Sequence, residues 1–242
     1  MNLFIVDFKA KRLLSTQEVN QEDSLESSQA DIFESYRQTL ENQLARFSDQ
    51  VPKQGLIFKQ DFKNGFDSYG YGNSHDSFHQ WKGGKYWNSP IPVMADLFAI
   101  NAFLEKNQNK TIRFGKKSDP FMWMDSKYEM TKKVFILANK YNVKLVIHTM
   151  SDLCAREDYR NLIKAGNHSV VMNLGLVEYQ NDRVERILSP GAPSLKRRNL
   201  ALSVLRKNGV SVKTLKVSVG SLSEKKRLIL NKKLLGQFPV AI

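Results

Sequence analysis

Two histidines four positions apart have the spacing in this chain that best suits metal chemistry. His75, Asp76 and His79 form a His-Asp-x2-His pattern, and imidazoles at positions i and i+4 of a helical turn point the same way, as a metal pair requires. His148, at the end of a predicted strand, is a third imidazole that could join them. Because such a pair also occurs by chance and no acid is tied to it, we expect no metal site and keep His75 and His79 as candidates.

Two aspartates on either side of an aromatic run are candidates for acid–base chemistry. Asp119 and Asp125 flank residues 121–123, and we take Asp119 and His148 as the candidate catalytic residues. An aspartate before proline more often caps a turn, which is the alternative for Asp119. The sequence has neither a Gly-x4-Gly-Lys-Ser/Thr phosphate loop nor a Gly-x-Ser-x-Gly nucleophile elbow.

Aromatic side chains interleaved with lysines fill the segment 61–91. This composition is typical of a surface that stacks bases while it holds phosphates, and long loops in compact domains tend to be functional. The aromatics could equally pack beneath the loop, and that alternative stays open. The residues concerned are Tyr69, Tyr71, Phe78, Trp81, Lys82, Lys85, Tyr86 and Trp87.

The net charge of +13 is unevenly distributed along the chain. Residues 184–242 contain thirteen Lys/Arg and two Asp/Glu, whereas residues 1–50 contain five and nine. A field of one sign attracts polyanions, so the last quarter favours a nucleic acid or an acidic protein as partner. Solvated helix faces are the alternative. The candidate phosphate contacts are Lys82, Lys85, Lys196, Arg197, Arg198, Lys225, Lys226 and Arg227, with Lys232 and Lys233 on the same predicted helix.

The composition limits the class of protein. The 242 residues are enough for one substantial core, and a single cysteine, Cys154, excludes an internal disulfide and every multi-cysteine zinc pattern. We expect Cys154 to be a small buried hydrophobe. No apolar run is long enough to span a membrane, so we expect a cytoplasmic protein without membrane contact.

Short β-rich runs alternate with amphipathic segments from residue 55 onward, which predicts βα units and a parallel sheet. We expect strands at residues 56–59, 111–115, 144–149, 169–174 and 210–217, and helices at 93–105, 127–141, 154–164, 194–207 and 223–235. Upstream, apolar residues at steps of about four predict a helix with a core-facing stripe formed by Ile32, Tyr36, Leu40, Leu44 and Phe47. In parallel α/β folds, ligands bind at the carboxyl ends of the strands, so we expect a site there.

Three stretches taken in order resemble the radical S-adenosylmethionine superfamily and, within it, the spore photoproduct lyase-like group. In 112–121 a strand ends in Gly115 and leads into a Ser-Asp-Pro turn; in 146–158 a strand leads through Thr-Met-Ser to an Arg-Glu-Asp helix start. In 187–212 a Ser-Pro-Gly-Ala-Pro loop precedes an Arg-containing helix and a Gly-Val strand. The resemblance covers about residues 55–217.

This resemblance implies a partial (β/α)6 barrel of the TIM type. It divides the chain into an N-terminal arm with an amphipathic helix at 1–50, the barrel at 51–220 and a basic C-terminal helix at 221–242. If S-adenosylmethionine were bound, Arg113 and Gly115 are the residues that would meet its adenosyl portion.

The chain departs from this family at the residues that bind the cluster. The family's Cys-x3-Cys-x2-Cys loop holds a four-iron, four-sulfur cluster, and here the same spacing falls on Asn64, Ser68 and Tyr71, none of which supplies a thiolate. Met150 stands where lysine is usual, and Ser189 where the family loop commonly carries an acid. We therefore expect no iron–sulfur cluster, no other cofactor and no cleavage of S-adenosylmethionine.

These features together favour a cluster-less relative that binds nucleic acid in DNA repair, DNA modification or phage biology, in a prokaryotic cell or an infected host. One alternative is a structural or regulatory subunit that joins an acidic protein partner. Another is an enzyme with altered chemistry at the barrel mouth, through His75, His79, His148 and Asp119.

Overall fold

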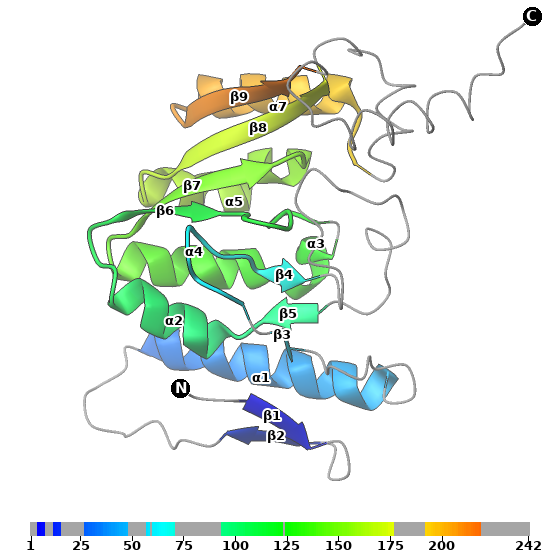
Figure 1. The fold of residues 1–242 in the computed structure, drawn as a ribbon, viewed down its shortest axis with the longest axis vertical. Helices are drawn as coiled ribbons and strands as arrows, with labels where there is room; N and C mark the ends of the chain where they lie inside the picture. Colours follow the sequence, from blue (N-terminus) through cyan, green and yellow to red (C-terminus); the bar gives the residue numbers. More distant parts are fainter. Residues whose placement is uncertain are drawn as a thin grey trace, which may run out of the picture.

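The computed structural model contains three small sheets and the helices packed around them (Figure 1). Its described residues are 4–7, 12–15, 27–47, 57–58, 60–70, 93–122, 124–176 and 192–218. Some expectations from the sequence therefore lie outside the described residues. They are those for His75, Asp76 and His79, for Tyr71, Lys82 and Lys85, and for the C-terminal helix with Lys225, Lys226 and Arg227.

The largest sheet has four parallel strands whose order in space, β6-β7-β8-β9, is also their order in the chain. The strands are β6 (Thr111–Phe114), β7 (Lys144–Thr149), β8 (Ser169–Leu176) and β9 (Ser211–Val217). Runs of Val, Ile and Leu form them because branched side chains suit a pleated, half-buried surface. The mixed α/β class, the parallel sheet and the positions of these four strands are confirmed.

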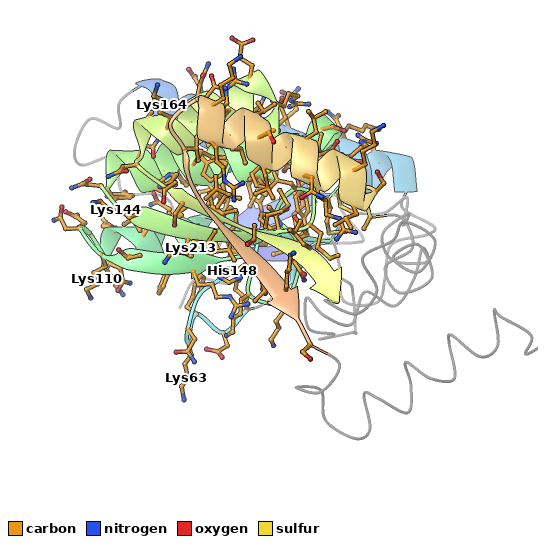
Figure 2. All side chains as sticks on the ribbon, turned by 90° about the horizontal axis from the view of Figure 1, so that it is seen from above. Lys63, Lys110, Lys144, His148, Lys164 and Lys213 are labelled. Atoms are coloured by element: carbon orange, nitrogen blue, oxygen red, sulfur yellow. The ribbon has the colours of Figure 1, made fainter. Side chains whose placement is uncertain are left out.

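Helices connect each strand to the next. The connecting elements are α3 (Asp125–Tyr128), α4 (Met130–Lys140), the 3-10 turn η1 (Asp152–Ala155), α5 (Glu157–Ala165) and α7 (Leu195–Lys207). Because parallel crossovers are right-handed and the strands follow one another in a single direction, these helices must cover the same face of the sheet. Figure 2 shows α7 and Lys164 of α5 on one side of the sheet, with His148 and Lys213 on the other.

The two faces of this sheet differ in burial. Side chains facing the helices are buried and mostly apolar: Ile112, Phe114, Leu145, Ile147, Val170 and Met172. The intervening side chains are half-buried or exposed, as the alternation along a strand requires. We call them the open face, which consists of Thr111, Arg113, Lys144, Val146, His148, Ser169, Val171, Ser211 and Lys213.

A second sheet joins the first through a short segment that begins at Gly65. It contains β3 (Ile57–Phe58), β4 (Tyr69–Gly70) and β5 (Val93–Ala95), in the order β3-β5-β4. Between β3 and β4, Phe66 pairs with Phe114 of β6, and its N–H donates to the Arg113 carbonyl at 3.1 Å. Gly65 has φ +120°, and a Cβ there would lie 2.4 Å from that same carbonyl oxygen, so only glycine fits this approach.

The prediction of a helix at 93–105 is wrong for its first residues. Residues Val93–Ala95 form β5, and α2 covers only Leu97–Glu105. Asp96 marks the boundary, because its carboxylate accepts hydrogen bonds from the N–H groups of Phe98 and Ala99 at 3.0 and 3.2 Å.

The N-terminal part contributes one long helix and a hairpin. In α1 (Ser27–Phe47), Ile32, Tyr36 and Leu40 are buried, which confirms the expected stripe for these three; the side chains of Leu44 and Phe47 lie outside the described ones. The Tyr36 hydroxyl donates to the Ala95 carbonyl at 2.9 Å, so α1 is packed against β5 and α2 (Figure 1). The hairpin of β1 (Phe4–Asp7) and β2 (Arg12–Ser15) was not predicted.

Candidate functional site

The carboxyl ends of β6 and β7 meet at the buried side chain of Asp119. Its carboxylate accepts hydrogen bonds from the Thr149 hydroxyl at 2.7 Å, from the Met150 N–H at 2.6 Å and from the Phe121 N–H at 2.9 Å. Burial raises the pKa of Asp119 to about 6. The bond to Phe121 is the turn cap expected of an aspartate before proline, and the bonds to Thr149 and Met150 fasten this turn to the end of β7.

Asp119 and His148 are not brought together. Thr149 points toward Asp119, and because neighbouring side chains of a strand alternate, His148 lies on the open face (Figure 2). Asp119 is fully buried with donors on its carboxylate, so it positions the loop after β6 and has no exposed edge for a reacting group. The described residues therefore do not form the acid–base pair that the sequence suggested.

A second buried carboxyl, Asp125, joins three elements. It accepts hydrogen bonds from the hydroxyls of Tyr69 and Tyr159 and from the Thr131 N–H at 2.9 Å. Burial raises the pKa of Asp125 to about 6 and raises the pKa of both tyrosines. Because the whole group is buried, its evident role is to tie β4, α4 and α5 together.

The positions with cluster-loop spacing lie in different environments. Asn64 is exposed, with φ 64°, whereas Ser68 is buried with its hydroxyl 3.0 Å from that of Thr131. Tyr71 lies outside the described residues. Asn64 and Ser68 therefore do not share a ligand-binding surface.

The two residues considered for an adenosyl contact lie in β6 and directly after it. Gly115 has φ +87°, and a Cβ there would lie 2.5 Å from the His148 carbonyl oxygen, so this position needs glycine for packing alone. Arg113 is on the open face, and its Nε is buried with no acceptor among the described residues. A buried donor of this kind is unusual in a folded protein.

The cations expected at the start of α7 are not equivalent. Lys196 and Arg197 are exposed, and Arg197 forms an ion pair with Asp152 at 2.6 Å. Arg198 is only 1% exposed; its Nε donates to the Pro193 carbonyl at 2.8 Å and its Nη1 to the Asn173 carbonyl at 3.2 Å. Arg198 is thus committed to the protein backbone, and a phosphate contact from it does not fit this position.

Cys154 has the environment expected of it. It is fully buried in η1, its thiol donates to the Ser151 carbonyl at 3.2 Å, and burial raises the pKa of the thiol well above its ordinary value. The side chain is therefore a packing residue, as predicted.

Sequence reasoning missed the cations of the open face. Arg113, Lys144 and Lys213 lie on it together with His148, and Lys213 is in register with Val171, which pairs with His148. None of the four strands described in this sheet contains an aspartate or a glutamate. The signal was present as Lys, Arg and His at alternate strand positions, on the side opposite the apolar residues.

Comparison with known proteins adds no assignment: no family model, no curated protein and no solved structure matches this chain. Among the described residues, no three His, Cys, Asp or Glu side chains are grouped so as to hold a metal ion. Within the same residues, no helix has both the length and the apolarity needed to cross a membrane.

Proposed function

We propose that this protein binds nucleic acid through its basic surfaces. The observation that carries the proposal is the positive charge of α7 and of the strand after it. Residues 192–218 contain no acid, and Lys196, Arg206 and Lys207 of α7 are exposed. Exposed cations without neighbouring acids attract phosphates and release the counterions condensed on them, which supplies most of the affinity for a polyanion.

The surroundings of each predicted phosphate contact determine how strongly that residue can contribute to binding. Lys196 is exposed, Arg197 is partly neutralised by Asp152, and Arg198 is buried, so Lys196 is the strongest of the three. The proposal also includes the contacts predicted outside the described residues, which are Lys82, Lys85, Lys225, Lys226 and Arg227.

We further propose that the fold is a partial (β/α)6 barrel and that the chain is a cluster-less relative of the spore photoproduct lyase-like group. Two observations support this: the strands are parallel and neighbours in chain order, and their helices cover one face. In this proposal the ancestral cleavage of S-adenosylmethionine has been lost, and the protein acts in the cytoplasm in DNA repair, DNA modification or phage biology.

A protein partner is the second candidate, and one observation favours it. Leu200 of α7 is 65% exposed and lies between Lys196 and Lys207 at helical steps of three or four residues that include Ser203. An exposed leucine within a basic helix face suits an acidic, partly apolar protein surface better than a phosphate backbone.

The test is binding of single- and double-stranded DNA and RNA, followed by fluorescence anisotropy over a salt series. The variant Lys196→Glu/Lys207→Glu is compared with the matched control Lys106→Glu/Lys164→Glu, which changes the net charge equally at exposed sites on α5 and next to α2. We expect the α7 variant to weaken binding and to lower the log–log salt slope by about 1.4, or about 0.7 for each phosphate of a single strand that is no longer neutralised. Absence of binding by the unaltered chain at low salt would contradict the proposal, and copurification of an acidic protein at fixed stoichiometry would support the second candidate.

A further inference from the structure

We infer that the open face binds a single-stranded segment of nucleic acid, with phosphates held by a basic rim and bases lying against an apolar centre. This inference rests on the proposed function and names a surface for it that differs from the α7 face. Three features carry it: the charges of the strands, the side chains at the centre of the face, and Arg113.

The rim of the open face is basic on several sides. Lys144 at the start of β7 and Lys213 in β9 are exposed, and Lys110, just before β6, is exposed at the same end of the sheet. Figure 2 shows Lys110, Lys213 and His148 on the side away from α7, with Lys63 projecting farthest from the sheet. From standard strand spacings, Lys144 and Lys213 are roughly 16 Å apart, about two Debye lengths in physiological salt, so each lysine acts mainly on the phosphate nearest to it.

Acids do not offset this charge within the described sheet. The four strands contain none, and Asp61, next to the loop lysine Lys63, is paired with Lys116 at 3.2 Å. The helix side carries charges of both signs, because α5 begins with Glu157 and Asp158 while α7 is basic. The described strands carry only positive charge on the open face, which favours a polyanion there as well.

The centre of the open face is suited to unpaired bases. Val146 and Val171 are half-buried on adjacent strands, and His148 is in register with Val171. An unpaired base can stack on the imidazole of His148 and lie against the two valines. A duplex keeps its bases stacked inside and would meet the rim alone, so we expect the single strand to bind more tightly.

Arg113 gives an independent indication that this face receives an acceptor. Its Nε is buried and has no acceptor among the described residues, although buried donors are nearly always hydrogen-bonded. Arg113 is in register with Val146, next to the centre of the face. A phosphate oxygen or a base carbonyl would satisfy this donor once the Arg113 side chain turns outward, with the guanidinium supplying a charge-assisted bond.

The first experiment compares two lysines on opposite sides of the sheet. Lys213→Ala and Lys164→Ala each remove one exposed positive charge, and equal thermal unfolding temperatures would show that both variants fold. With a mixed-sequence single-stranded oligonucleotide, we expect Lys213→Ala to weaken binding by roughly threefold to tenfold and to lower the salt slope by about 0.7. Lys164→Ala should bind like the unaltered chain.

The second experiment needs no variant. Lysine acetylation is mapped by mass spectrometry on the full chain with and without the same oligonucleotide. We expect Lys144 and Lys213 to become protected, while Lys164 keeps its reactivity.

The outcomes separate this inference from the proposed function. If the unaltered chain binds no nucleic acid at low salt, both fail. A second outcome is that the unaltered chain binds, Lys213→Ala binds equally well, and Lys144 and Lys213 stay as reactive as Lys164. The open face is then not the binding surface, and α7 remains the surface proposed for nucleic acid. Tighter binding of a duplex than of a single strand would also overturn the inference.

Discussion

Arg198 shows how one residue position decides whether a cation is functional or structural. It shares a helix face with Ala201, Leu202 and Leu205, all buried, because these positions follow it by three, four and seven residues. Its neighbours Lys196 and Arg197 fall on other faces of the helix and reach solvent. Three adjacent basic residues therefore divide into exposed charges and one buried guanidinium that holds the loop before α7.

We expect Arg198→Met to destabilise the protein by about 2 to 4 kcal/mol, because the carbonyls of Pro193 and Asn173 would lose their donor. The salt slope of nucleic-acid binding should not change. Denaturant unfolding and anisotropy measure the two effects. The control is Arg197→Met. Loss of the exposed ion pair between Arg197 and Asp152 should lower the free energy of unfolding by less than about 1 kcal/mol. A lower salt slope with unchanged stability in Arg198→Met would refute this assignment.

Two close backbone approaches that require glycine lie beside β6, one to the second sheet and one to β7. Gly115 ends β6 where its N–H donates to the Phe66 carbonyl at 3.0 Å, and Gly65 lies against Arg113. Both have positive φ, and a Cβ on either would overlap a backbone carbonyl oxygen. Gly65 therefore permits the segment that carries β4 to lie beside β6, and Gly115 permits the chain after β6 to pass close to the end of β7.

Gly115→Ala should lower the free energy of unfolding by about 2 to 4 kcal/mol, since it combines an unfavourable φ with a Cβ placed 2.5 Å from the His148 carbonyl. Gly209→Ala is the matched control: its φ is +77°, yet a Cβ there meets nothing within 4 Å. The control should cost about 1 kcal/mol. Equal losses at the two positions, measured by denaturant unfolding, would show that packing at Gly115 is unimportant.

Sequence patterns predicted the parallel elements well and their boundaries less well. The four strands of the sheet were predictable because Val, Ile and Leu concentrate in them, whereas β5 was missed because residues 93–105 are mostly apolar on both sides of the strand boundary. The signal for the boundary was Asp96, an N-cap residue within that run. The pairing of Phe66 with Phe114 depends on residues far apart in the chain, so no local pattern could reveal it.

Sequence patterns predicted the candidate site only in part. The basic residues at the start of α7 were recognised as a run of charge, but the direction of each side chain depends on which face the helix buries. The open face was missed because Arg113, Lys144 and Lys213 belong to strands that are distant in sequence and become neighbours only in the sheet.

In mild acid, the dependence of stability on pH comes from buried groups whose contributions to stability change in opposite directions. Burial raises the pKa of Asp119 and Asp125 to about 6, so the stability that each contributes is fully present below its ordinary pKa and is lost as pH rises through 6. Burial lowers the pKa of His168 to about 4, so its contribution is present above its ordinary pKa of 6.5 and is lost as pH falls toward 4. The contributions partly cancel, which flattens the dependence on pH.

The histidine contribution can be isolated with His168→Gln. The Leu145 N–H donates to Nδ1 of His168 at 3.1 Å, and the glutamine oxygen can accept the same bond without titrating. Between pH 7 and pH 4 we expect the stability advantage of the unaltered protein over the variant to shrink by about 3 kcal/mol. Denaturant unfolding at the two pH values measures this difference. An advantage that stays constant would mean that His168 does not titrate in this range.

The strand order places β9 at the end of the four-stranded sheet, with β8 on one side and no described strand on the other. Such an edge offers unpaired backbone groups to any second chain, and charged side chains along it are a common protection against aggregation. Lys213 and Lys216 of β9 supply that protection. If the open face binds a polyanion as we propose, neutralisation of Lys213 would leave Lys216 as the remaining protection of this edge, and binding would then favour self-association along β9.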